Sequence, residues 1–124
     1  MTLLELVVMA AILGILTIIG IPTYRATMER QYCRHSQDLL LAIYTAERVH
    51  QTDTGSYLAG DWTGLGLENP NAPGLAVSFA IDIAGCAPAP CFTATATYQG
   101  DALLTINQDR TRASPSGRCE VIPD

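Results

Sequence analysis

Four cysteines and one isolated glutamate are the residues of this chain whose types and positions could do chemistry. An even number of cysteines favours disulfides, and the alternative is a metal site. The chain has no C-x-x-C pair and no C-x-x-C-H haem signature, and only His35 and His50 could complete a zinc site. We therefore expect two disulfides, no metal and no cofactor. The four cysteines are Cys33, Cys86, Cys91 and Cys119.

The spacing of the cysteines favours one of the three possible pairings. Cys86 and Cys91 flank the connection APAP between two expected strands, so in a hairpin they face each other at bridging distance. Cys33 would then pair with Cys119 and pin the end of the chain to a helix. Pairing of Cys33 with Cys86 or with Cys91 stays open, if the first strand lies beside that helix instead.

Glu5 is the one carboxylate in the apolar opening MTLLELVVMAAILGILTIIGIP. As a helix, residues 1–21 would extend about 32 Å, which matches a hydrocarbon core of about 30 Å. Acidic side chains in such segments are costly and usually functional. The basic residues Arg25, Arg30 and Arg34 follow the run, as is common beside a membrane span. A membrane-targeting start and four cysteines together indicate an exported, oxidising location.

Gly14, Gly20 and Pro22 interrupt the apolar run. Proline removes an intrahelical hydrogen bond and glycine lowers helix propensity, so residues 14–22 form its weakest stretch. One interpretation is a kinked transmembrane helix, in which such residues are tolerated. The other is a segment that unwinds and stretches.

The remaining elements predict an α+β architecture. Residues 25–54 form the amphipathic second half of one long helix, which ends at Gly55. Its apolar stripe is broader than one core face needs, so we expect a neighbouring subunit to cover part of it. A loop at 55–74 leads to an antiparallel sheet at 75–108 and a tail at 109–124. Residues 1–24 form the apolar segment and residues 25–124 the head.

Alternating apolar residues mark the first two strands of this sheet, and ALLTINQ forms the third. In the first strand, five apolar side chains are expected on one face: Leu75, Val77, Phe79, Ile81 and Ile83. In the second, the expected apolar face carries Phe92, Ala94, Ala96 and Tyr98. We expect Gln99, Gly100 and Asp101 to form the turn into the third strand.

Composition and motifs exclude two classes of function. The net charge of −5 and the pI near 4.8 argue against a nucleic-acid surface, which is normally basic. The chain has no G-x-S-x-G, no H-E-x-x-H and no phosphate-binding glycine loop, so we do not expect an enzyme.

The stretch TLLELVVMAAILGILTIIGIPTY resembles the N-terminal signature of type IV pilins. The matching features are a small polar second residue, Glu5, an apolar run with Gly14, and Pro22 shortly before Tyr24. The signature covers about the first fifth of the chain, and the remainder is similar to the family in layout only.

This resemblance implies a short basic leader, removed by a prepilin peptidase that also N-methylates the new first residue, here Met1. Family members usually begin with Phe, so Met1 departs mildly from the pattern. The resemblance also implies the pilus assembly machinery as a partner, the inner membrane as the location of the unassembled pool, and an extracellular filament as the product.

In such a filament the apolar helices bundle into a core with little water, where an unpaired carboxylate costs several kcal/mol. The amine of Met1 on an adjoining subunit is the expected partner of Glu5, which would then fix the register between helices. The alternative is a carboxylate that reaches the membrane surface.

Three functions follow as expectations. The first is the structural subunit of a type IV pilus for adhesion, motility or DNA uptake. The second is a pseudopilin of a type II secretion system, which shares the signature. That family typically lacks cysteines and carries a calcium site, so the four cysteines weigh against it. The third is a membrane-tethered binding module, in which Glu5 would have no purpose.

Overall fold

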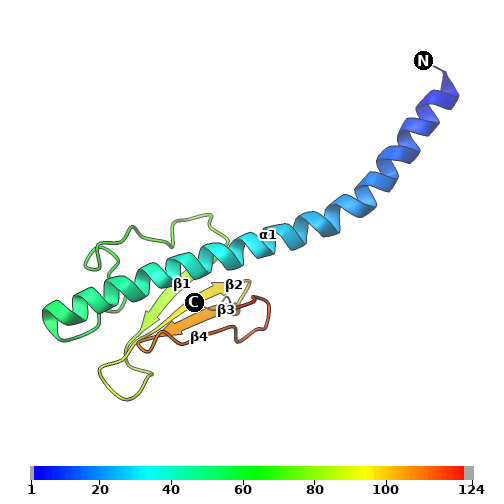
Figure 1. The fold of residues 1–124 in the computed structure, drawn as a ribbon. Helices are drawn as coiled ribbons and strands as arrows, with labels where there is room; N and C mark the ends of the chain where they lie inside the picture. The colour runs from blue at the N-terminus through cyan, green and yellow to red at the C-terminus, as the bar shows by residue number, and fades with distance from the viewer. Residues whose placement is uncertain (1, 122–124) are drawn as a thin grey trace. The chain divides into compact units, whose positions relative to one another are not determined.

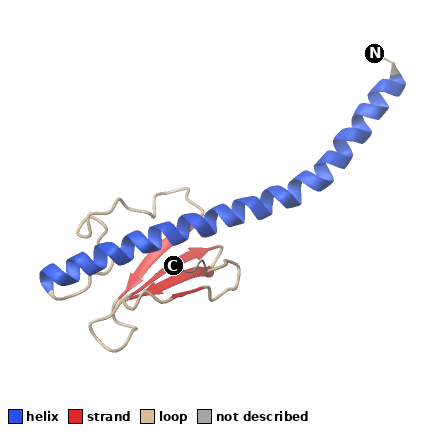
Figure 2. Ribbon diagram, in the orientation of Figure 1, coloured by secondary structure: helices blue, strands red, loops and turns tan. Residues whose placement is uncertain are grey.

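A computed structural model describes residues 2–121 of the chain, and they form two compact units, Met1–Gln31 and Tyr32–Asp124. The long helix α1, Leu3–Thr54, contributes residues to both units (Figure 1). The four strands all belong to the second unit (Figure 2).

Helix α1 ends where the sequence indicated. Gly55 adopts a φ of 83°, in the left-handed region that glycine enters without steric cost, and its N–H donates to the carbonyl of Gln51 at 2.8 Å. The part of α1 that belongs to the second unit packs on the sheet. Its buried side chains include Leu40 and Ile43.

The sheet is an antiparallel meander with the order β1-β2-β3-β4. Its strands are β1 (Val77–Asp82), β2 (Thr93–Tyr98), β3 (Asp101–Asn107) and β4 (Arg112–Ala113). Gln99 and Gly100 both have positive φ and form a two-residue hairpin turn between β2 and β3. Asp101, which was also expected in this turn, instead begins β3 and pairs with Tyr98. One long helix and an antiparallel sheet confirm the predicted α+β class.

The first strand is shorter than the alternation of its sequence suggested. Val77, Phe79 and Ile81 are buried as expected, but Leu75 and Ile83 lie outside β1 and are 59% and 41% exposed. Leu75 lies in a turn, where its N–H donates to the carbonyl of Ala72. At the other end, the carboxylate of Asp82 accepts hydrogen bonds from the N–H groups of Ala84 and Gly85 and turns the chain away. The prediction that this strand extends from Leu75 to Ile83, with five apolar side chains on one face, was therefore wrong at both ends.

The region expected to be only a tail contains the fourth strand. In β4, Arg112 pairs with Ile106 and Ala113 pairs with Thr105. Two residues are too few to show an alternating pattern, so sequence periodicity cannot reveal such a strand.

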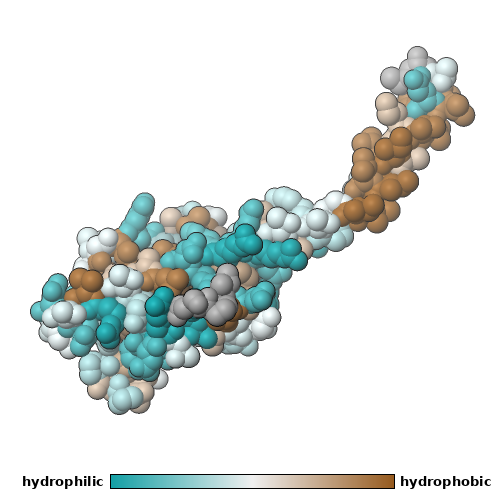
Figure 3. Space-filling view, viewed as in Figure 1, coloured by the Kyte–Doolittle hydropathy of each residue, from teal (hydrophilic) through white to brown (hydrophobic). Residues whose placement is uncertain are grey.

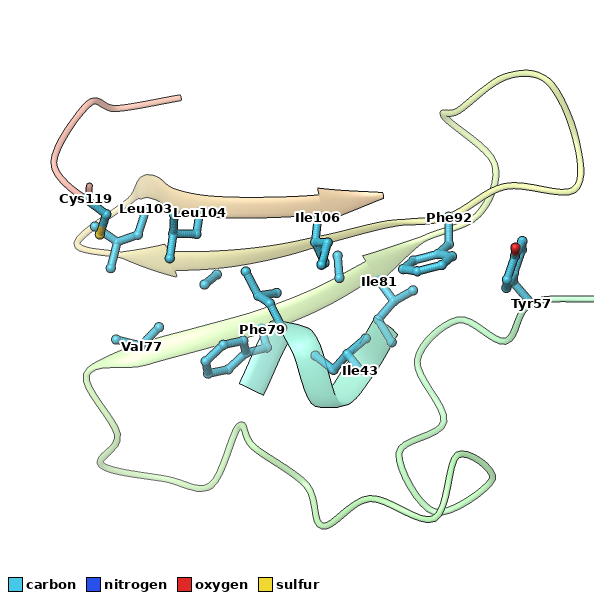
Figure 4. Close-up of a cluster of buried hydrophobic side chains, with 13 residues drawn as sticks. Ile43, Tyr57, Val77, Phe79, Ile81, Phe92, Leu103, Leu104, Ile106 and Cys119 are labelled. Atoms are coloured by element: carbon cyan, nitrogen blue, oxygen red, sulfur yellow. The ribbon is translucent and has the colours of Figure 1, made fainter. Parts of the chain in front are cut away.

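The core of the second unit lies between α1 and one face of the sheet (Figure 4). Phe92 is fully buried, and its ring centroid is 4.8 Å from that of Tyr57. Leu103 and Leu104 are both buried although they are adjacent in β3, because the register with β2 shifts beside them. Such a bulge places two consecutive residues opposite one and interrupts the alternation of faces.

A buried carboxylate of α1 anchors the chain that follows the helix. Glu47 is fully buried, and its Oε2 accepts a hydrogen bond of 2.9 Å from the N–H of Leu58. Its other carboxylate oxygen, Oε1, is buried without a hydrogen-bond partner in the described part of the chain. Burial raises the pKa of Glu47, while the Leu58 hydrogen bond and the nearby charge of His50 act in the opposite direction.

Candidate assembly site

Glu5 forms a reciprocal cap with Thr2 at the start of α1. The N–H of Glu5 donates to Thr2 Oγ1 at 3.3 Å, and the N–H of Thr2 donates to Glu5 Oε2 at 3.5 Å. This is the geometry of a capping box, in which two otherwise unpaired N–H groups of a helix start are satisfied. In the single chain Glu5 is exposed and serves its own helix.

This local role of Glu5 was not among the predictions above, although the T-x-x-E spacing of residues 2–5 signals it. Met1, the expected partner of Glu5 between subunits, lies outside the described residues. The pairing of Glu5 with the amine of a neighbouring chain therefore stays a prediction.

Residues 3–24 of the first unit expose an almost continuous apolar surface, seen in brown in Figure 3. Part of α1 is long and apolar enough to cross a membrane, and none of that stretch is buried within the chain. Soluble monomers rarely expose apolar patches of this extent, which mark contacts with lipid or with other subunits. The exposed large apolar residues of this segment are Leu3, Leu4, Leu6, Val7, Val8, Met9, Ile12, Leu13, Ile15, Leu16, Ile18, Ile19, Ile21 and Tyr24.

In the single chain, α1 is continuous through Gly14, Gly20 and Pro22. Pro22 has no N–H to offer the carbonyl of Ile18, so the helix is weakened there without being broken. Within residues 2–121, no atom beyond the adjoining residues and the nearby helix backbone lies within 4 Å of a Cβ added at Gly14 or Gly20, so no contact in the described part of the chain requires glycine at these positions. Loss of helix at 14–22 in a filament stays a prediction.

Threonine hydroxyls within this segment are satisfied inside the helix. Thr17 Oγ1 donates to the carbonyl of Leu13 at 2.7 Å, and Thr23 Oγ1 donates to the carbonyl of Ile19 at 3.0 Å. Such bonds allow hydroxyl groups to enter surroundings that offer no water.

Two disulfides close the second unit. Cys33 is bonded to Cys119 and Cys86 to Cys91, with Cα atoms 5.6 Å and 6.0 Å apart. These are the pairs that the sequence favoured.

Further contacts hold the C-terminal segment beside the Cys33–Cys119 bond. The Arg118 guanidinium lies 5.0 Å from the centroid of the Tyr98 ring and pairs with Asp101 at 3.2 Å. The Tyr98 ring in turn contacts that of Tyr32 on α1, with centroids 5.1 Å apart. Covalent and non-covalent links therefore attach this segment to the same region of the second unit.

A shallow groove follows a face of α1 in the second unit that the sheet leaves open. It is lined by Tyr44, Thr45, Arg48, Val49, Thr52 and Asp53. Val49 is 58% exposed there. The groove agrees with the broad apolar stripe that the sequence analysis noted on this helix.

Within residues 2–121, His, Cys, Asp and Glu side chains form no cluster of three or more that could hold a metal ion. Comparisons with protein-family models, with curated proteins and with solved structures find no match to this chain. Its function is therefore argued from the residues and geometry described above.

Proposed function

We propose that the chain is the structural subunit of a type IV pilus, which polymerises through the first part of α1 into a cell-surface filament. The observation that carries the proposal is the exposed apolar helical segment of the first unit, which has one carboxylate, Glu5, near its start. In a lone membrane anchor Glu5 would serve only as the helix cap with Thr2, whereas in a bundle of identical helices the same carboxylate can also set their register.

The second unit has the properties of a head that functions outside the cell. Two disulfides stabilise a small core, and the Cys33–Cys119 bond ties the C-terminal segment to α1. The groove at Tyr44 and Val49 offers a second surface for a neighbouring subunit. Before assembly, the apolar segment would hold the chain in the inner membrane, where the prepilin peptidase and the assembly machinery act.

A pseudopilin of a type II secretion system would use the same N-terminal features. The disulfides remain the reason to prefer the pilus subunit, because the resemblance implies that pseudopilins typically lack cysteines. A membrane-tethered binding module is the third possibility.

Electron microscopy of material sheared from the cell surface tests the proposal. Cells that process the full chain should yield long filaments containing it, and cells carrying Glu5→Ala should retain the protein in the membrane fraction without filaments. Only short assemblies would favour the pseudopilin. Wild-type chain found solely as a membrane-bound monomer would favour the binding module and contradict the proposal.

A further inference from the structure

Strand β1 lies at an open edge of the sheet, because its one neighbour is β2. In an antiparallel strand, alternate residues direct both backbone groups to the same side. Phe79 directs its N–H and C=O away from β2, so Val77 and Ile81 do the same. These three residues form the outer edge of β1.

The side chain of Asn71 occupies the centre of this edge. The N–H of Phe79 donates to Asn71 Oδ1 at 2.6 Å, and Asn71 Nδ2 donates to the carbonyl of Phe79 at 2.8 Å. Phe79 thus exchanges two hydrogen bonds with the side-chain amide of Asn71, as it would with one residue of an added antiparallel strand. Asn71 is itself held in place, because its N–H donates to Asn69 Oδ1 at 2.9 Å.

The rest of the edge has no comparable partner. Within residues 2–121, no hydrogen bond joins the outward N–H or C=O of Val77 or Ile81 to another part of the chain. Natural edge strands usually carry lysine, proline or a bulge that prevents pairing with another strand. Residues 77–81 of β1, with the sequence VSFAI, contain no charge, no proline and no bulge.

The strand with which β1 is best matched is a second copy of itself. In an antiparallel pair centred on Phe79, the outward groups of Val77 on one chain face those of Ile81 on the other. The solvent-facing side chains of Ser78 and Ala80 are small, and Asp82 lies opposite Ala76, so no like charges meet. The Phe79 residues of the two chains form the central pair of this arrangement. In each chain, Asn71 must release Phe79 before the two strands can pair.

We propose that Asn71 acts as a side-chain strand cap, which blocks the edge of β1 and prevents edge-to-edge pairing with β1 of a second copy. This role is independent of the filament proposed above, because it concerns an edge of the sheet and not the apolar segment of α1.

Amide hydrogen exchange of the full wild-type chain in detergent micelles tests the cap without any substitution. Phe79 should exchange about tenfold more slowly than Val77 and Ile81, since an ordinary hydrogen bond shifts a local opening equilibrium by about this factor. All three side chains are buried, so side-chain burial does not predict the difference. Equal exchange at the three amides would overturn the proposal.

The variant Asn71→Ala tests the consequence, by analytical ultracentrifugation and exchange over a range of concentrations. It should self-associate about tenfold more tightly than wild type, with protection of Val77, Phe79 and Ile81 that rises with concentration. The matched control is Asn107→Ala, which removes another asparagine side chain that makes two hydrogen bonds with the backbone, away from this edge. Asn107 Oδ1 accepts both of them, from the N–H groups of Asp109 and Thr111.

Adding Ala80→Lys to Asn71→Ala should restore the monomer, because it places like charges close together across the paired strands. Association of Asn71→Ala no tighter than that of Asn107→Ala would overturn the proposal. Association without protection at the three edge amides would also overturn it. If Asn71→Ala does not fold, the wild-type exchange rates alone decide.

Discussion

Cys33 on α1 is joined by a disulfide to Cys119, although the two residues are 86 positions apart in the sequence. The other disulfide, Cys86–Cys91, closes a loop with a separation of only 5. A cross-link restricts the unfolded chain more strongly when the loop that it closes is longer. The two bonds therefore differ in their contribution to stability.

We expect the long disulfide to stabilise the second unit more than the short one. The chain-entropy model gives about 4.6 kcal/mol for Cys33–Cys119 and about 2.2 kcal/mol for Cys86–Cys91. Replacing the first pair with serine should therefore lower the free energy of unfolding by about 2 kcal/mol more than replacing the second. Urea unfolding followed by Trp62 fluorescence measures both, and equal losses would contradict this ranking.

The role of Glu5 in assembly can be separated from its role as a helix cap. Thr2→Ala removes the hydroxyl of the capping box, which should weaken the start of α1 by about 1 kcal/mol but leave the carboxylate in place. We expect Thr2→Ala to retain filaments and Glu5→Ala to lose them, with the head folded in both. Filament yield in sheared fractions is the measurement. Equal loss in both variants would assign Glu5 to capping alone.

The stability of the second unit should depend on pH through Glu47. Its pKa in the folded state is raised above the ordinary value of 4.5, mainly by burial. At pH values below 4.5 the carboxyl of Glu47 is largely protonated in both the folded and the unfolded state. As the pH rises from there to the raised pKa, the unfolded state ionises first, so the contribution of Glu47 to the free energy of unfolding decreases.

Glu47→Gln keeps an acceptor for the N–H of Leu58 and removes the ionisation. We expect this variant to become more stable relative to wild type as the pH rises through that window, as measured by urea unfolding at several pH values. Asp82→Asn is a control with the opposite sign in a lower pH range, because the N–H groups of Ala84 and Gly85 lower the pKa of Asp82 from its ordinary value of 3.8. This variant should lose stability relative to wild type as the pH rises towards 3.8 and show no change in the Glu47 window. A constant difference between Glu47→Gln and wild type across this pH range would contradict the prediction.

Phe92 should be among the residues most important for the core. It is fully buried and contacts the rings of Tyr57 and Tyr44. Phe92→Ala should lower the free energy of unfolding by about 3 to 5 kcal/mol, through lost burial and the cavity that remains. Tyr24→Ala, at a residue 65% exposed in the single chain, should change the stability of the second unit little in the same urea titration. Similar effects would be inconsistent with the described core.

In an assembled filament, we expect α1 to lose regular helix between Gly14 and Pro22 and to keep it on both sides. Pro22 leaves one backbone carbonyl without its helical partner, and the two glycines lower helix propensity by about 1 kcal/mol each relative to alanine. A density map of the filament checks this. A helix as continuous there as in the single chain would refute it.

Sequence patterns predicted those parts of the fold that depend on local periodicity. The helix end at Gly55, the buried face of β1 at Val77, Phe79 and Ile81, and the turn at Gln99 each follow from neighbouring residues. The anchoring of Leu58 by Glu47 and the capping of Phe79 by Asn71 depend on contacts between separate elements. A local pattern cannot reveal such partners.

The burial of Glu47 did leave a signal in the sequence. Leu40, Ile43 and Glu47 follow one another at the spacing of a single helix face, and all three are buried. A carboxylate in this stripe indicates either a partner or a functional group. At the candidate assembly site the T-x-x-E spacing of Thr2 and Glu5 is a similar signal, because it predicts the capping of α1 independently of any role of Glu5 in assembly.

The Cys33–Cys119 bond also determines how the chain responds to tension. A force applied at the two ends of the polypeptide passes from α1 through the sulfur atoms directly into the last residues, so all four strands lie within a covalent ring that carries no load along its backbone. Under oxidising conditions the chain can therefore lengthen only in the segments outside this ring, chiefly residues 3–32 of α1. The bond thereby makes residues 33–119 inextensible and confines stretching to the part of α1 that precedes Cys33.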